Sequence, residues 1–226
     1  MFYFLGIDIA GSNNTWVVAL GFSKDENTLI PVEALSLKNF SFPEPLLELE
    51  EVVKFSLKNR VIGAGIDAPL SFSLIEDKKG FRTADKFLKS ILPPRAKNWV
   101  VSYNALMAVP LRGLLLARKL SPFCGTIIET HPRASFYFCL PEQYKFLAFK
   151  YKKSSLLHEE KILIINIFKK FGIKKFKENL LVEGIIDAIF CALAVYFFHR
   201  APEKLLFLPD TPSAEGYGPF VIIKSF

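Results

Sequence analysis

The chain has 226 residues, of which 51% are hydrophobic and 23% are charged, and its formal net charge is +7. This length and balance allow a buried core and exclude a disordered tail, so we expect a single domain over residues 1–226. The longest apolar run, residues 188–198, is too short for a membrane span, and the N-terminus lacks the basic start of a signal peptide, so we expect a cytoplasmic protein with no membrane partner.

The first part of the chain predicts strands followed by a crossover. Apolar runs separated by turn residues indicate three antiparallel strands at 2–9, 15–22 and 28–37. Residues 46–59 show the spacing of an amphipathic helix, and the apolar run 61–67 ends at a proline. A strand that follows a helix and an earlier strand implies a parallel pair, so the sheet is expected to be mixed.

The rest of the chain predicts an insertion, a fifth strand and long helices. Residues 70–122 read as a helical insertion, the strand is expected at 126–130, and the last helix at about 185–198. Two tail segments, 205–208 and 220–223, could add edge strands. The predicted fold class is therefore α/β, with a mixed five-stranded sheet flanked by helices and an insertion at about 70–122. This order of elements is that of the ribonuclease H-like fold.

Four carboxylates occupy similar places in this pattern. Asp8, Asp67 and Glu129 end apolar strands, and Asp187 begins an apolar helix. Burial of several uncompensated carboxylates is costly, and they repel one another. Bound Mg²⁺ or Mn²⁺ would remove that cost, and two such ions can activate a water and stabilise the leaving oxygen of a phosphodiester. The four acids therefore predict a two-metal nuclease site.

Each of these residues also has a structural interpretation. A lone aspartate at a strand end often forms a turn, Asp187 could simply favour the start of its helix, and Glu129 could pair with Arg133. Alternation along a strand puts His131 on the same face as Glu129, so His131 is a further catalytic candidate that could orient a ligand or shuttle a proton.

Five short blocks carry a resemblance to a known family. GIDIAGS (6–12), GIDAPLS (65–71), RTAD (82–85), ETHPR (129–133) and IDAIFCALA (186–194) resemble the signature blocks of an uncharacterised domain-of-unknown-function family of predicted nucleases with a ribonuclease H-like fold. The last block also resembles the helix of Holliday-junction resolvases in which an aspartate at the helix start binds metal. The resemblance implies that the four acids form the metal site, with Arg82 and His131 as its neighbours.

One position departs from this pattern. Related helices often carry a second acid three residues before the aspartate, where this chain has Gly184. Glu183 could replace it as a metal ligand, because residues i and i+4 share a helix face. Arg82 and Arg133 are expected to contact substrate, although Arg82 could instead pair with Asp85 on its own helix.

The positive charge is concentrated in one segment. Residues 145–177 contain ten lysines and two glutamates, a composition that can bind a phosphate backbone or form a solvated face. Aromatic residues alternate with lysines at its start, which suits base stacking or a packed core. The lysines predicted to bind nucleic acid, DNA or RNA, are Lys152, Lys153, Lys169 and Lys170.

The leading hypothesis is a Mg²⁺- or Mn²⁺-dependent nuclease that hydrolyses phosphodiester bonds of nucleic acid. A second hypothesis is a small nucleotide-dependent kinase of the actin-like superfamily, which shares the core fold and a similar first turn. A third is a non-catalytic nucleic-acid-binding protein of the same fold. Nucleotide binding without cleavage would favour the second, and salt-dependent nucleic-acid binding without cleavage the third.

Overall fold

The computed structural model describes residues 2–9, 15–23, 28–35, 45–73, 78–106, 108–153, 155–174, 176, 178–210 and 213–224. Within these ranges seven strands form one mixed sheet in the order β3-β2-β1-β4-β6-β9-β7. A separate antiparallel pair joins β5 (Ser71–Phe72) to β8 (Glu215–Gly216). The strands of the main sheet are β1 (Phe2–Asp8), β2 (Trp16–Ser23), β3 (Thr28–Leu35), β4 (Val61–Asp67), β6 (Thr126–Thr130), β7 (Leu205–Phe207) and β9 (Phe220–Ile223).

The pairing agrees with the predicted mixed α/β sheet but not with its predicted size. β1, β2 and β3 form an antiparallel meander, and β4 and β6 continue the sheet in parallel with β1. The prediction of five strands is wrong, because β9 pairs in parallel with β6 and β7 pairs with β9. β9 consequently lies inside the sheet and is buried along its whole length, a place that its short apolar run did not reveal.

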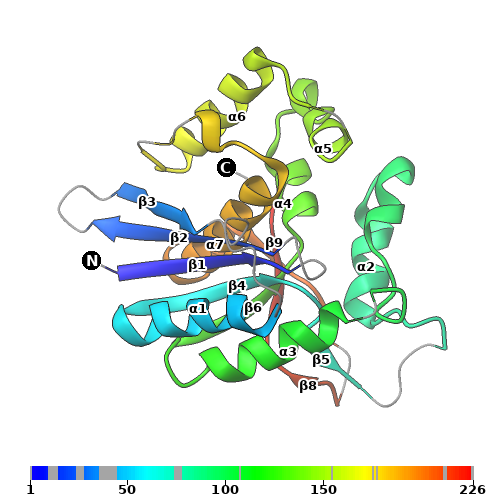
Figure 1. Cartoon of the computed structure of the whole chain (residues 1–226). Coiled ribbons are helices and arrows are strands. Elements are labelled where there is room, and N and C mark those ends of the chain that lie inside the picture. The colour runs from blue at the N-terminus through cyan, green and yellow to red at the C-terminus, as the bar shows by residue number, and fades with distance from the viewer. Residues whose placement is uncertain are drawn as a thin grey trace.

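Helices cover both faces of the sheet. Figure 1 shows α1 and α3 on one side and α7 with α4 on the other, which gives three layers. None of the helices in the described ranges combines the length and the apolar character that crossing a bilayer requires. The helices are α1 (Pro45–Lys58), α2 (Thr83–Ile91), α3 (Val109–Leu120), α4 (Pro132–Cys139), α5 (Leu147–Lys150), α6 (His158–Lys170) and α7 (Glu183–Arg200), with 3₁₀ turns η2 (Pro94–Trp99), η3 (Glu142–Tyr144), η4 (Glu178–Leu180) and η5 (Pro202–Lys204).

The helix α7 is the centre of the core. It is apolar on all sides because the sheet covers one side and other helices cover the opposite one. Two glycines let it approach the strands closely: a Cβ on Gly6 would lie 1.8 Å from the carbonyl oxygen of Ala188, and one on Gly65 2.1 Å from that of Cys191. This contact fixes the start of α7 against the ends of β1 and β4.

The predicted insertion is mostly helical. Residues 83–91 form α2, and the Pro93-Pro94 pair follows its end and begins η2. The next helix starts at Val109, because Pro110 suits a first turn and lacks the amide that a helix interior needs. In Figure 1, α2 stands beside the sheet, facing the end where β1 and β4 finish.

Candidate active site

Three aspartates meet at one end of the sheet. Asp8 ends β1 and Asp67 ends β4, and the two residues are direct partners in the parallel register. Asp187 comes from the second turn of α7, which packs on both strands. Asp8 and Asp187 are buried and Asp67 is partly buried. The fold therefore brings these three acids together, and the fourth acid of the sequence pattern, Glu129, is close enough for its charge to act on Asp67.

Burial and mutual repulsion disfavour the charged forms of two of these acids. Burial raises the pKa of Asp8 well above its ordinary value, and the charges of Asp187 and Asp67 add to the rise. The pKa of Asp67 is raised to about 8, mainly by burial and then by Asp187. Two neighbouring carboxyls with raised pKa values are typical of functional sites.

Two consecutive residues hold the third carboxylate. The hydroxyl of Tyr151 donates a 2.6 Å hydrogen bond to Oδ1 of Asp187, and the Lys152 ammonium forms an ion pair with Oδ2. Burial and the negative charge of Asp187 raise the pKa of Tyr151, which therefore stays a donor. Burial opposes the charge of Lys152, but attraction by Asp187 and Asp8 prevails and raises its pKa.

Glu129 belongs to a separate, fully paired cluster. Its carboxylate accepts from Arg82 through Nη1 at 2.7 Å and also through Nη2, and its Oε2 accepts from the amide of Leu70 at 2.8 Å. Asp85 takes the other side of the guanidinium, with Nε at 3.0 Å and Nη2 at 2.9 Å. All three side chains are buried. We refer to Arg82, Asp85 and Glu129 as the arginine clamp.

The arginine clamp leaves Arg82 no donor for a substrate. Its Nη1 also reaches the carbonyl of Ser71 at 3.2 Å, so all five N–H groups have acceptors. The alternative pairing of Arg82 with Asp85 is thus present, whereas Glu129 pairs with Arg82 and not with Arg133. The clamp ties α2 to the end of β6, and the predicted ligand and substrate roles of Glu129 and Arg82 stay predictions.

His131 caps α4. Its Nδ1 accepts from the amide of Ala134 at 3.4 Å, and its Nε2 lies 3.3 Å from the carbonyl of Trp99, to which it must donate. Burial lowers the pKa of His131, in keeping with this neutral form. Both ring nitrogens are therefore engaged by the backbone, and the predicted proton shuttle stays a prediction.

Arg133 and Thr130 present polar atoms without partners. The guanidinium of Arg133 lies over the Trp99 ring at 4.1 Å, and its Nε donates to the carbonyl of Ala148 at 2.9 Å. Within the described residues, the buried Oδ2 of Asp187 accepts no hydrogen bond, and the buried Nη2 of Arg133 and Oγ1 of Thr130 have no hydrogen-bond partner either. Because buried donors are normally satisfied, the Arg133 and Thr130 atoms indicate a place for an acceptor from outside the chain.

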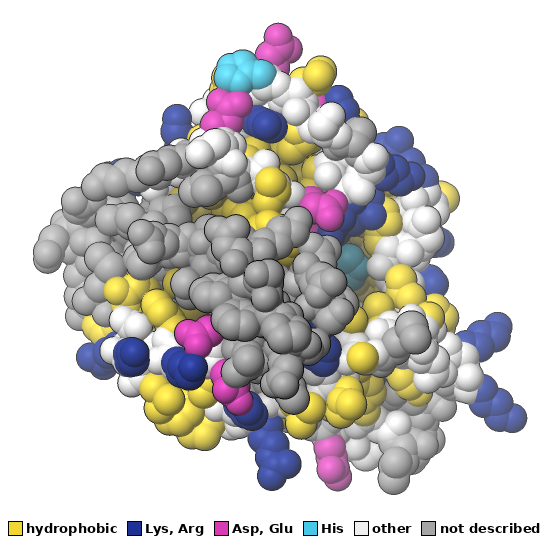
Figure 2. All heavy atoms as spheres, in the orientation of Figure 1, with side chains coloured by type: hydrophobic (Ala, Val, Ile, Leu, Met, Phe, Trp, Pro, Cys, Tyr) yellow, Lys and Arg dark blue, Asp and Glu magenta, His cyan; other side chains and the backbone are white. Residues whose placement is uncertain are grey.

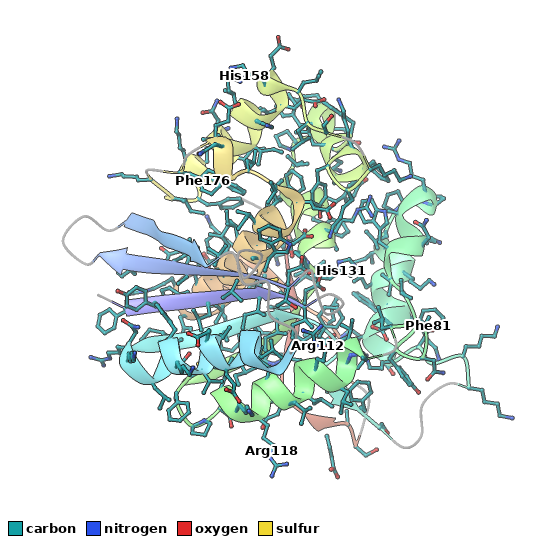
Figure 3. The ribbon with its side chains drawn as sticks, viewed as in Figure 1. Phe81, Arg112, Arg118, His131, His158 and Phe176 are labelled. Carbon is teal, nitrogen blue, oxygen red and sulfur yellow. The ribbon has the colours of Figure 1, made fainter. Side chains whose placement is uncertain are left out.

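A pocket of about 430 Å³ joins these groups. Asp67 and Asp187 line it, whereas Asp8 does not. The arginine clamp, Thr130 and Arg133 form further polar parts of the wall, beside apolar side chains. Figure 3 shows His131 near the centre of the molecule, between α7 and α2, and Figure 2 shows a histidine at the same place in a recess. Carboxylates and a partly buried guanidinium thus share one cavity.

The three aspartates offer the right kind of ligand for a metal ion but do not form a preformed metal site. Among the described residues, no group of three or more His, Cys, Asp and Glu side chains is arranged as a ready metal cluster. The ligand type nevertheless suits Mg²⁺ or Mn²⁺, since Asp8, Asp67 and Asp187 are hard oxygen donors whose repulsion a cation would relieve. Glu183, the predicted substitute ligand, is exposed and contributes its charge to the surroundings of Asp8.

The basic segment contributes unequally to this site. Lys152 lines the pocket, whereas Lys153, Lys169 and Lys170 are exposed and are not among its lining residues. Figure 2 shows Lys and Arg side chains gathered at the upper right, over α5 and the neighbouring end of α2. The alternating aromatics are divided in the same way, since Tyr151 is buried in the core and Phe146 is exposed.

Comparison with known proteins adds no assignment. No family model, no curated protein and no solved structure matches the chain. The resemblance of the five blocks to a family of predicted nucleases therefore stays a prediction, and the function is argued from the site.

Proposed function

We propose that the chain is a metal-dependent nuclease that hydrolyses phosphodiester bonds of nucleic acid. The observation that carries this proposal is the meeting of Asp8, Asp67 and Asp187 at the ends of three core elements, with carboxyl pKa values raised by burial and mutual repulsion. A structural role would not require three carboxylates to be placed in this arrangement, because each pays a desolvation cost.

The three aspartates would hold Mg²⁺ or Mn²⁺. A divalent cation bound there supplies Lewis-acid stabilisation of the phosphoryl oxygens and lowers the pKa of an attacking water. The chain's own contribution is rigidity: Tyr151 and Lys152 fix the Asp187 carboxylate, and the backbone of β1 and β4 fixes the other two acids. Such preorganised charges cost no rearrangement during the reaction.

Arg133 and Thr130 would bind the phosphate. Nη2 of Arg133 and Oγ1 of Thr130 are donors without partners in the described residues, and both residues line the same pocket as Asp67 and Asp187. Stacking on Trp99 holds the guanidinium in place. A phosphate oxygen would satisfy both donors, and its ester bond would then lie next to the acidic part of the wall.

Nucleic acid is the favoured substrate class for two reasons. Basic side chains gather next to the pocket, and Arg95 of η2 lies 3.8 Å over the Phe149 ring, which brings η2 together with the basic segment. The mixed sheet flanked by helices also supports the proposal, since it is the coarse architecture expected from the sequence. Positive charge next to a carboxylate site suits a chain of phosphates.

The test is cleavage of labelled single-stranded, duplex, hybrid and branched nucleic acids with Mg²⁺ or Mn²⁺. We expect wild-type protein to cleave at least one of them and Asp67→Asn to lose cleavage while it stays folded. Asp210→Asn is the matched control, because it makes the same chemical change at an exposed aspartate outside this pocket. Full activity of Asp67→Asn would overturn the proposal.

A second variant examines the phosphate contact. Arg133→Lys keeps the positive charge but loses the planar fork and its stacking on Trp99, so we expect a higher KM with a smaller change in kcat. An unchanged KM would remove Arg133 from substrate binding. If no nucleic acid is cleaved by wild-type protein under any of these conditions, the nuclease proposal itself fails.

A further inference from the structure

The ammonium of Lys152 lies among the three aspartates, where a positive charge relieves the repulsion between their carboxylates. It forms an ion pair with Oδ2 of Asp187, whose side chain is fully buried, and it also attracts Asp8 and Asp67. The preceding residue, Tyr151, binds the other oxygen of the same carboxylate. Asp187 therefore has a protein group at each oxygen: a hydrogen bond at Oδ1 and the Lys152 charge at Oδ2, which accepts no hydrogen bond from the described residues. Asp8 and Asp67 stand side by side as the remaining acidic pair.

A fourth carboxylate cannot enter the cluster from position 184 of α7. A Cβ on Gly184 would lie 1.9 Å from Cδ1 and 2.2 Å from Nε1 of Trp16, so the indole ring fills the space of any side chain there. Trp16 is buried in the core and cannot move aside cheaply. Glu183, on the neighbouring position, is exposed.

The charges of the cluster then match a single divalent ion. When all three carboxyls are ionised, as metal ligands must be, three carboxylates and one ammonium leave two negative charges, which one divalent cation neutralises. Two divalent ions would add more positive charge than these groups can balance, and they would crowd the ammonium. We propose that the Lys152 ammonium is the resident cation of the acidic site, so that one divalent cation binds beside it and not two. This inference rests on the proposed metal-dependent function.

The first experiment measures metal binding without nucleic acid. Wild-type protein is titrated with Mn²⁺ in a calorimeter, and the number of bound ions is also counted from the Mn²⁺ electron paramagnetic resonance signal. We expect one site, which Asp67→Asn removes. Two Mn²⁺ ions that both depend on Asp67 would overturn the inference, and so would the absence of any Mn²⁺ binding.

The second experiment removes the ammonium. Lys152→Met keeps an unbranched side chain and loses the charge, so we expect Mn²⁺ to bind at least about tenfold more tightly or a second ion to bind. Lys152→Arg should retain one site, and Lys153→Met is the matched control on the adjacent exposed residue. Equal Mn²⁺ binding by Lys152→Met and Lys153→Met would contradict the role of Lys152. If Lys152→Met does not fold, the number of Mn²⁺ ions bound by wild-type protein and by Lys152→Arg still tests the inference.

The failure of this inference can be told apart from failure of the proposed function. One Mn²⁺ site without cleavage of any nucleic acid would leave the resident cation in place and reject the nuclease. Cleavage that requires two bound Mn²⁺ ions would support the nuclease and reject the resident cation.

Discussion

The arginine clamp and the aspartate cluster are two groups of buried carboxylates that differ in how completely a cation pairs with them. In the clamp, one guanidinium uses all five N–H groups, and Glu129 and Asp85 are paired on both sides. In the cluster, Asp8, Asp67 and Asp187 share the single ammonium of Lys152. Both groups contain an acid at the end of a core strand, so strand position alone does not distinguish a structural carboxylate from a reactive one.

The two groups differ in the cationic side chain that pairs with their carboxylates. A fixed, fully bonded guanidinium contacts both carboxylates of the clamp and ties the insertion to the sheet. In the cluster, one ammonium faces three carboxylates, and the remaining two negative charges would be balanced by an external cation. The clamp should therefore govern stability and the cluster should govern metal binding. The predictions below test this division, beginning with the largest effect.

Loss of the clamp cation should have the largest effect. Arg82→Met leaves Glu129 and Asp85 buried without their partner, so we expect the free energy of unfolding to fall by about 3–5 kcal/mol. Urea denaturation followed by circular dichroism measures this change, with exposed Arg118→Met as the control. A decrease below about 1 kcal/mol would mean that the clamp is not a stabilising element.

The pH dependence should sharpen the comparison. The pKa of Asp67 is raised from 3.8 to about 8, and that of Asp8 is also raised, so the folded state binds more protons than the unfolded chain between these values. The contribution of these groups to the free energy of unfolding must then fall as the pH rises from about 4 to about 8. Urea denaturation of wild-type protein and Asp67→Asn in EDTA measures it; equal pH slopes would contradict the raised pKa.

Removal of one cluster acid should stabilise the metal-free fold. Asp67→Asn relieves repulsion with Asp187, so at pH 8 in EDTA we expect the free energy of unfolding to rise by about 0.5–2 kcal/mol while Mn²⁺ binding is lost. Differential scanning calorimetry with and without Mn²⁺ measures both changes. A destabilised variant would place Asp67 with the clamp residues as a structural group.

The smallest effect concerns His131. If it acts as a helix cap, His131→Asn should keep stability, since asparagine caps well, and His131→Ala should lose about 1 kcal/mol. Cleavage by His131→Asn then separates capping from proton transfer. Wild-type cleavage rates in this variant would limit His131 to a positioning role, and a large loss of kcat with an unchanged fold would restore it to catalysis.

The apolar pattern of the chain predicted most of the framework. Strand ends at Asp8, Asp67 and Glu129 were visible because apolar runs stop there, and the start of α7 was visible from its apolar length. The place of β9 inside the sheet was not, because a run of four residues carries no signal of its neighbours. The local apolar pattern predicts that a strand exists, whereas the strands with which it pairs depend on long-range packing.

The charge partners were the part that sequence could not supply. Arg82 lies 47 residues before Glu129, and only the packing of the insertion brings them together. Tyr151 and Lys152 lie in a segment whose alternation of aromatic residues and lysines gives no sign that these two residues turn toward Asp187. The nearest available signal was the resemblance of the RTAD and ETHPR blocks, which grouped Arg82 with Glu129 but did not predict their pairing.

The main chain of α7 contacts the main chain of the sheet directly. The acidic cluster should therefore keep its geometry when core side chains are substituted. Gly6 and Gly65 bring backbone against backbone, so main-chain atoms, and not interlocking side chains, determine how far Asp187 stands from the other two aspartates. A combinatorial library that varies Phe136 and Phe168, which pack against the other side of α7, should yield variants of altered stability that retain the cluster. Any substitution at either glycine would force the helix outward and pull the cluster apart.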